Sequence, residues 1–221
     1  LHNRVIGVCS ALGQHDSGSH LHRMGQLLFT RQGCVRLTLN NGALLCLLPP
    51  TRAAWIPAGI DHRAEMKSIV DYRSIWFHPT HYPALPRHPA ILNVGPLLRE
   101  LLERIAASPW DSDWQNGIGW HLAALCEAEM CSAAQEPMML ALPQDKRLAL
   151  LAGDALPPPL QQLAVRCGAS EKTISRIFRR DTGMTYQQWR QQWRLMKAVE
   201  LLATGARITD TAQALDFASD S

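Results

Sequence analysis

The chain has 221 residues, 47% of them hydrophobic, and a formal net charge of +3. This length can bury at least one full core and leaves room for two domains. No run of about 18 apolar residues could cross a bilayer, and the first residues lack the basic and apolar segments of a secretory signal. These features exclude an integral membrane protein and predict a cytoplasmic one. Because the sequence begins at Leu1 rather than Met, it does not fix the natural start.

The first part of the chain, from about residue 4 to 78, predicts a β-rich segment. Short apolar or alternating runs are separated by turn signals: VIGVCSAL, QLLFT, CVRLTL, ALLCLL, AAWIP and SIVDYRSIWF. Asn41-Gly42, between the third and fourth runs, is a strong hairpin signal because both residues accept a positive φ. Many short strands at close spacing indicate a small barrel or sandwich.

The second part is predicted to be helical. It follows the stretch HPTHYPALPRHP, whose prolines can sustain neither a helix nor a central strand. Apolar residues at helical spacing then mark two amphipathic helices, at about 94–107 and 117–131: Leu97, Leu98, Leu101, Leu102 and Ile105 for the first, Ile118, Leu122, Leu125 and Cys126 for the second. Their apolar faces either form a dimer surface or pack against the β-rich part.

The third part begins at about residue 143. DKRLALLAGDA predicts a helix that is stopped by three consecutive prolines at 157–159. The next stretch, LAVRCGASEKTISRIF at 163–178, has the pattern of a helix-turn-helix. Ala164 is small where two helices would cross, Gly168 can take the positive φ of the turn, and Ser170 can cap the second helix.

Helical spacing divides this motif into two faces. The apolar residues that fall on the inner face are Leu163, Cys167, Ile174 and Ile177, and the polar residues left outside are Glu171, Lys172, Ser175, Arg176 and Arg179. Between Arg166 and Lys197 there are eight Lys or Arg against two acids, whereas residues 1–142 balance at eleven against eleven. A basic excess confined to the motif favours a DNA-binding surface over an ordinary helical hairpin of an enzyme.

The β-rich part contains a second pattern, His20-x-His22-x3-Gln26-x6-Gly33, followed by Pro57-x-Gly59-x2-His62. Two histidines one residue apart on a strand project to the same face, and a partner strand could bring a third beside them. Three imidazoles suit a divalent transition metal such as Zn, Ni, Cu or Fe. The alternative is that these side chains line a ligand pocket or hydrogen-bond one another.

These two motifs resemble those of the cupin barrel, G-x5-HxH-x3,4-E-x6-G and G-x5-PxG-x2-H-x3-N. The resemblance spans roughly residues 4–78 and has three departures: Gln26 replaces the acidic ligand, Thr51 the opening glycine and Met66 the asparagine. It implies a cupin-like fold, while the neutral amide of Gln26 weakens the prediction of a metal.

The stretch LQQLAVRCGASEKTISRIFRRDTGMTYQQWRQQWRLMKAVELLATG after such a barrel resembles the AraC/XylS family of bacterial transcription regulators. The resemblance implies two helix-turn-helix units joined by a long helix, about 186–202, that lets both reach successive major grooves. The family's base-reading positions fall on Lys172, Ser175 and Arg176, and Arg179 and Arg180 are better placed for phosphates. We expect Trp189 and Trp193 on the long helix to pack the domain core.

A second helix-turn-helix begins at Ile208, with Thr209 as its predicted cap, Ala212 as its small crossing residue and Asp216 at the turn, where Asp tolerates the left-handed conformation. The sequence ends at Ser221, before the expected second recognition helix. We therefore expect a truncated DNA-binding domain that binds its operator more weakly than an extended chain.

Together these features predict an α+β protein of two domains. The predicted segments are a cupin-like sensor barrel at 1–90, a helical dimerisation segment at 91–135, a linker at 136–142 and the helix-turn-helix domain at 143–221. The predicted function is a transcriptional regulator that binds double-stranded operator DNA as a homodimer and responds to a small-molecule effector, with an efflux or resistance gene as a candidate target.

Two other classes are open at this stage. One is a metal-dependent cupin enzyme, such as a dioxygenase or isomerase, against which the departures at Gln26, Thr51 and Met66 count. The other is a sugar-binding or scaffold protein without a DNA role, which the local charge excess opposes. We therefore predict no enzymatic activity and no membrane partner.

Overall fold

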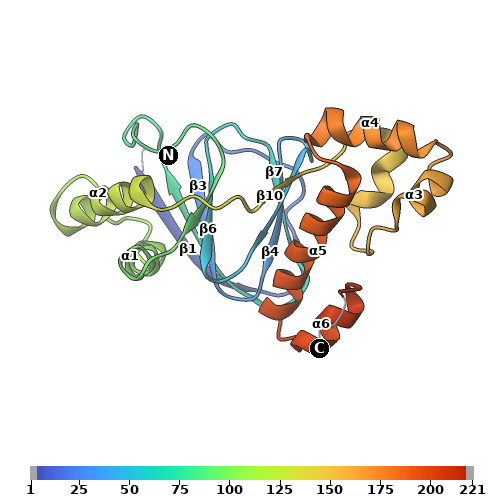
Figure 1. Ribbon diagram of the computed structural model, residues 1–221. Helices are drawn as coiled ribbons and strands as arrows, with labels where there is room; N and C mark the ends of the chain where they lie inside the picture. The colour runs from blue at the N-terminus through green and yellow to red at the C-terminus, as the bar shows by residue number, and fades with distance from the viewer. Residues whose placement is uncertain (1–3, 218–221) are drawn as a thin grey trace.

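A computed structural model describes residues 4–217 of the chain. Its strands form two five-stranded antiparallel sheets (Figure 1). Sheet A has the strand order β1 (Val5–Leu12), β8 (Val70–Phe77), β3 (Gly25–Gln32), β6 (Arg52–Ile56) and β9 (Ala90–Asn93). Sheet B has the order β10 (Met139–Ala141), β5 (Leu44–Leu48), β4 (Val35–Leu39), β7 (His62–Met66) and β2 (His15–Asp16).

Helices cover the outer faces of both sheets. α1 (Pro96–Ala106) and α2 (Gly117–Ser132) lie against sheet A, and the C-terminal helices lie on the side of sheet B (Figure 1). The latter are the 3₁₀-helix η1 (Lys146–Ala152), α3 (Leu160–Arg166), α4 (Glu171–Thr182), α5 (Tyr186–Ala203) and α6 (Ile208–Ala214). The predicted α+β class with a C-terminal helix-turn-helix is confirmed.

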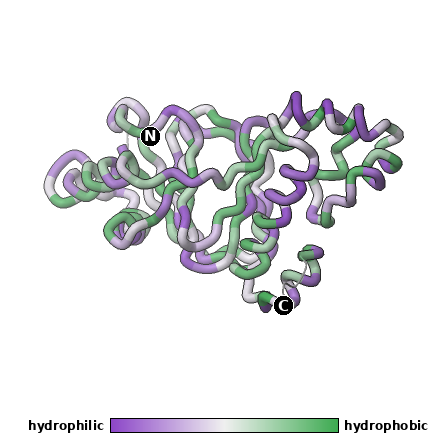
Figure 2. The backbone as a smooth tube through the Cα atoms, in the orientation of Figure 1, coloured by the Kyte–Doolittle hydropathy of each residue, from purple (hydrophilic) through white to green (hydrophobic). Residues whose placement is uncertain are grey.

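The layers follow from side-chain alternation along the strands. In β3, Leu28 faces a core between the two sheets, whereas Leu27 and Phe29 face the core under α1. β5 carries the run LLCLL, with Cys46 and Leu48 in the inter-sheet core and Leu45 and Leu47 on the opposite side. A strand buried on both faces reads as a continuous apolar run, as β5 does. In Figure 2 hydrophobic stretches in the sheets alternate with hydrophilic ones.

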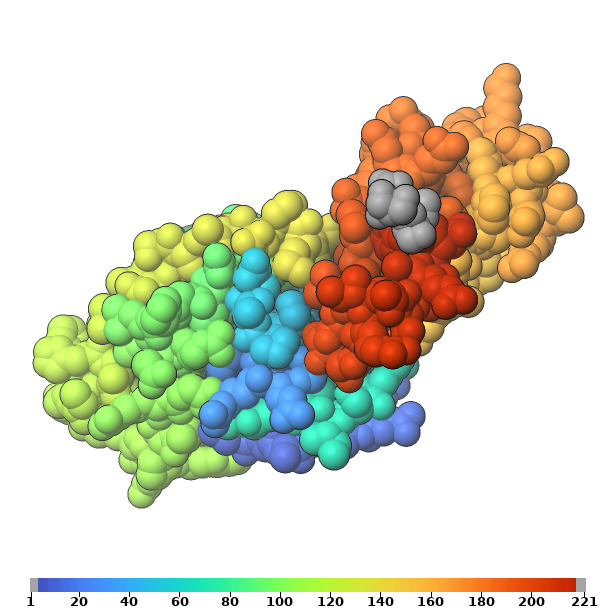
Figure 3. Space-filling model, turned by 60° about the horizontal axis from the view of Figure 1, so that its bottom comes forward, coloured from blue at the N-terminus to red at the C-terminus, as the bar shows by residue number. Residues whose placement is uncertain are grey.

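Leu45 and Leu47 belong to one buried cluster that also contains the helix-turn-helix core. Trp189 of α5 is fully buried there, and its Nε1 donates to the carbonyl of Ala141 in β10 at 2.7 Å. Figure 3 shows the red C-terminal helices seated against the blue and cyan strands, with the orange helices projecting away. Sheet B and α5 therefore share a single hydrophobic core, and the predicted packing role of Trp189 and Trp193 is confirmed.

Charged side chains frame this contact. Asp154, after η1, accepts from Arg36 of β4 at 2.6 Å, pairs with Lys67 and lies 3.4 Å from Lys197 of α5. Lys197 also pairs with Glu200 at 2.5 Å. Because Arg36 is buried, Asp154 supplies the counterion that its guanidinium requires.

Several local predictions need correction. Residues 146–152 form a 3₁₀-helix rather than an α-helix, with Asp145 capping it. His20 lies in a loop and forms only an isolated bridge to His62, so His20 and His22 are not on a strand. Leu97, Ile118 and Leu125 are exposed on α1 and α2, because other residues of these helices face sheet A.

The predicted linker at 136–142 includes β10, which pairs with β5 through Leu140 opposite Leu45. Asn41-Gly42 does lie in the β4–β5 hairpin, within a four-residue loop whose Asn40, Asn41 and Gly42 all have positive φ. In the described part of the chain, no helix has both the length and the apolar character needed to cross a membrane.

We expect Gly7→Ala to destabilise the fold. A Cβ at Gly7 of β1 would lie 2.1 Å from the backbone carbonyl oxygen of Ile105 in α1, so α1 would have to move away from sheet A. Overpacking of this kind costs about 1–3 kcal/mol of unfolding free energy. Gly13→Ala is the matched control, since its Cβ would meet nothing within 4 Å. Equal urea midpoints for the two variants would contradict this packing.

Candidate functional site

The helix-turn-helix is built as its sequence predicts. Gly168 has φ +59°, and Ala164 is buried where α3 and α4 cross. The Oγ of Ser170 accepts from the backbone N–H of Thr173 at 3.1 Å, which caps α4. Ile174 and Ile177 are buried, as expected, and so is Phe178, which the inner-face prediction did not include. Cys167 is only partly buried and directs its thiol to the carbonyl of Arg147 at 3.2 Å.

The opposite face of α4 is polar and open to solvent. Lys172, Arg176 and Arg179 are exposed, and Ser175 is half-buried beside them. None of these three cations has an ion-pair partner among residues 4–217. Arg180 differs, because its Nε donates to the carboxylate of Asp181 at 2.6 Å. Hydrophilic residues follow the outer turns of α4 in Figure 2.

Three other basic residues of the third part, all on α5, contact groups inside the protein. Arg190 donates to the carbonyl of Pro157 at 2.6 Å, and Arg194 donates to that of Leu215 at 2.7 Å. Lys197 faces Asp154 and Glu200, as described above. Of the eight cations between Arg166 and Lys197, five are exposed to solvent, and four of these five lie on α4: Lys172, Arg176, Arg179 and Arg180. The fifth, Arg166, lies on α3.

α6 begins the second helix-turn-helix, with one correction. Its N-cap is Arg207, so the prediction that Thr209 caps the helix is wrong; Thr209 lies within the first turn, and Arg207 pairs with Asp210 at 2.8 Å. Asp216 has φ +57°, as the sequence predicts for the turn. The predicted truncation concerns residues after 217, which lie outside the described part.

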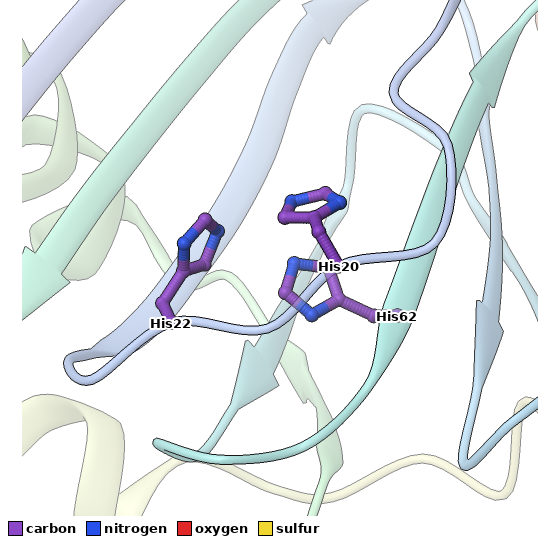
Figure 4. A group of neighbouring side chains, drawn as sticks. All are labelled: His20, His22 and His62. Carbon is purple, nitrogen blue, oxygen red and sulfur yellow. The ribbon is translucent and has the colours of Figure 1, made fainter.

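The three histidines of the β-rich part form a cluster. Their ring centroids lie 4.7 Å (His20–His22), 4.4 Å (His20–His62) and 5.0 Å (His22–His62) apart. Figure 4 shows His20 and His22 on one loop and His62 on the neighbouring strand β7. Paired backbone hydrogen bonds between His20 and His62, at 3.0 and 2.9 Å, hold the two segments together. One ring nitrogen from each of the three histidines lies within 4.8 Å of those of the other two.

The donor chemistry of this cluster fits the divalent metal that a cupin-type site implies. Nδ1 of His20 lies 3.0 Å from the carbonyl of Gly18, and Nδ1 of His62 lies 2.9 Å from that of Ile60. A carbonyl only accepts, so each Nδ1 carries the proton and each Nε2 is left as a lone-pair donor to a metal. The Nε2 of His62 is buried and has no hydrogen-bond partner among the residues that the structure describes.

Burial also favours the neutral imidazoles that metals require. It lowers the pKa of His22 to about 4, with smaller contributions from His62 and His20, and it lowers the pKa of His62. When bound, a metal would supply a Lewis-acidic anchor for an electron-rich atom of a ligand. His20, His22 and His62 would hold it.

Gln26 lies beside the cluster but is tied to sheet A. Its Nε2 donates to Ser74 Oγ at 2.8 Å and to Tyr72 Oη at 3.2 Å. Gln26 and Tyr72, together with His20 and His62, border a cavity of about 110 Å³. The prediction from sequence missed Tyr72 and Ser74, although their alternation along SIVDYRSIWF places them on the same face of the strand.

The sequence is similar to that of known helix-turn-helix regulators. Residues 163–221 match the family model described as "Helix-turn-helix domain". Over 99% of its length the chain is 24% identical to "HTH-type transcriptional regulator NimR" of Escherichia coli (strain K12), of which it covers 81%. These two matches support an AraC-family transcription regulator.

Solved structures show weaker likeness to this chain. Apo ToxT from Vibrio cholerae strain SCE256 is 10% identical, with a TM-score of 0.41 over 96% of this chain and 89% of ToxT. Oxalate decarboxylase from B. subtilis is 10% identical, with a TM-score of 0.28 over 76% of this chain and 29% of that enzyme. The support for an AraC-family regulator comes from the two sequence matches.

We expect the histidine cluster to bind Zn²⁺ or Ni²⁺ and His62→Ala to weaken that binding. Mutating a residue that only hydrogen-bonds to a metal ligand typically lowers metal affinity by about 10- to 100-fold. Because His62 would be a ligand itself, its removal should lower the affinity by more than that. Isothermal titration of metal-free protein measures it, with His88→Ala, an exposed histidine, as the matched control. Equal metal affinity in the two variants would count against a metal site here.

Proposed function

We propose that this AraC/XylS-family regulator reads double-stranded operator DNA with the outer face of α4 and responds to a small molecule bound by its β-rich part. One observation carries the proposal: a capped helix beside a tight turn presents three unpaired cations to solvent. A helix of this kind fits the major groove of B-DNA.

Within α4, we assign two different tasks. Lys172, Ser175 and Arg176 would reach base edges, since Lys and Arg donate to O6 and N7 of guanine. Arg179, without an ion-pair partner in the described structure, would contact phosphate. Arg180 would also contact phosphate, but only by exchanging its ion pair with Asp181.

The sensor part of this proposal rests on the paired sheets. We assign residues 1–90 to a cupin-like barrel, 91–135 to the dimerisation segment, 136–142 to the linker and 143–221 to the DNA-binding domain. His20, His22, Gln26 and His62 would receive the effector or a metal that helps to bind it. A ligand changes DNA affinity only if it binds the two arrangements of the domains unequally.

We propose no catalytic role for the histidine cluster and a cytoplasmic location, where DNA is accessible. In the proposed role, His20 and His62 at this 110 Å³ cavity would hold a metal or the effector and would not transfer protons. A metal-dependent dioxygenase or isomerase is the competing function. Turnover of candidate substrates by metal-loaded protein would favour that alternative.

The outer face of α2 supports a homodimer. Ile118, Trp120 and Leu125 are 67%, 48% and 43% exposed, and Ile118 and Leu125 are seven residues apart, so they share one side of the helix. α2 carries only two charged residues, Glu127 and Glu129. A weakly charged apolar helix face of this kind is typical of an oligomer interface.

We expect Arg176→Ala and Arg179→Ala to weaken operator binding in different ways. Arg176→Ala removes a base contact, so it should cost about 1–3 kcal/mol of binding free energy and relax the sequence preference at one base pair. Arg179→Ala removes a phosphate contact, so it should weaken binding to all DNA sequences alike and reduce the slope of log K against log salt by about 1. Gel shifts with the upstream region of the chain's own gene, across a salt series, measure both effects.

Arg104→Ala, which removes an exposed arginine of α1, is the control for these variants. It should leave operator affinity and its salt dependence unchanged. If Arg104→Ala weakens binding as much as Arg176→Ala does, the assignment of α4 as the reading helix is wrong.

We also expect Ile118→Glu with Leu125→Glu to shift the protein to monomer, because two like charges per subunit would meet across the α2 interface. Sedimentation velocity over a concentration series measures the change. Ile69→Glu, at an equally exposed isoleucine in the β7–β8 turn, should leave the dimer intact. A wild-type chain that remains monomeric throughout would contradict the proposed interface.

A further inference from the structure

A larger cavity, of about 330 Å³, lies away from the histidine cluster. It is formed at the ends of β3, β6 and β8, on the face of sheet A that also carries the α1 core, and the proline-rich segment after β8 closes it. Its walls include Trp55, Phe77 and Tyr82. The histidine cavity has a third of this volume and lies on the opposite, inward face of sheet A.

The volume of each cavity limits what it can hold. Pockets that bind drug-sized organic molecules usually measure about 300–1,000 Å³. The cavity of about 330 Å³ reaches that range, while the histidine cavity of about 110 Å³ does not. The histidine cavity suits a metal ion with one or two small ligands, whereas the larger cavity has room for an organic molecule.

The walls of the larger cavity are flat and rigid. Trp55 Nε1 donates to the carbonyl of Pro86 at 2.7 Å, which ties the indole to the proline-rich segment. The indole lies directly over Gly25, where a Cβ would be only 2.2 Å from its Cη2. Phe77 packs edge-on to Trp55 and to Tyr82, with centroids 6.2 and 5.1 Å away. Such surfaces favour a flat aromatic ligand and lose little entropy on binding it.

One charged residue lines this cavity. Arg87 is exposed at its edge and has no ion pair or hydrogen bond among residues 4–217. A carboxylate matches a planar guanidinium well, by two parallel hydrogen bonds. The cavity therefore offers apolar walls for a ring and a cation for an attached acid.

We propose that this cavity is a binding site for a small planar aromatic carboxylate, separate from the histidine cluster. The segment between β6 and β7 joins the two places. Pro57 and Ala58 line the larger cavity, whereas the N–H of Gly59 donates to the carbonyl of His22 at 2.8 Å and the carbonyl of Ile60 faces Nδ1 of His62. A ligand that displaces Ala58 would thus also shift the backbone that positions two of the histidines.

The test uses the full chain and two probes of the same shape, 1-naphthoate and the uncharged 1-naphthalenemethanol, measured by isothermal titration without DNA. Both should bind. Ala58→Leu fills the cavity and should weaken both by more than about tenfold, since an overfilled site must strain to admit a ring. Arg87→Gln should weaken naphthoate alone, by roughly threefold to fivefold, the range of an exposed ion pair. Arg23→Gln, at an exposed arginine outside the cavity lining, should change neither.

The position of the probe is read independently from the indole N–H resonance of Trp55, assigned with Trp55→Phe, which should shift on binding. Several outcomes would overturn the proposal: no binding of either probe at millimolar concentration, equal loss of naphthoate binding in Arg23→Gln and Arg87→Gln, or loss of binding in His62→Ala with Ala58→Leu unaffected. Because no DNA is present, these results are independent of whether α4 reads an operator.

Discussion

The arrangement of this protein depends on the contact between α5 and sheet B. Trp189 is fully buried, stacks near Tyr186 at a centroid distance of 6.2 Å and donates to the carbonyl of Ala141, so one side chain joins the helix-turn-helix core to the edge strand of a sheet. Replacing a buried tryptophan by alanine typically costs about 3–5 kcal/mol, a large part of the stability of a domain. Asp154 adds a second link between β4, the β7–β8 turn and α5. The DNA-binding helices are thereby seated on the sheets instead of being tethered to them by a flexible chain.

With α5 packed on sheet B, the outer face of α4 remains exposed to solvent. The basic residues of α5 are engaged with Pro157, Leu215, Asp154 and Glu200, whereas Lys172, Arg176 and Arg179 of α4 face solvent. On the other side of the molecule, α1 and α2 cover sheet A and leave the apolar outer face of α2 exposed. The sheets and their contact with α5 connect both cavities to the helices that include α4. The shared core is a physical route for such coupling, because its packing is rigid and a displaced side chain must move its neighbours.

Local rules explain what the sequence could predict. Gly168, Ser170 and the spacing of Ile174 and Ile177 define the helix-turn-helix within sixteen residues, so no distant contact was needed to recognise it. The short strands β2, β7, β9 and β10 were not predicted, because a strand of two to five residues gains its hydrogen bonds from partners far along the chain. The three histidines were grouped correctly, but their loop placement depends on the Gly18 turn and on the bridge from His20 to His62. The apolar run of β5 signals burial on both faces, yet it does not say that a helix more than 140 residues later provides the second cover.

Thermal unfolding followed by calorimetry tests the shared core most directly. If sheet B and α5 are packed as one unit, the chain should unfold in a single transition whose calorimetric and van't Hoff enthalpies agree. Trp189→Ala should then lower the melting temperature of that whole transition. Two resolved transitions in the unmodified chain, with the DNA-binding helices melting separately from the sheets, would contradict the account.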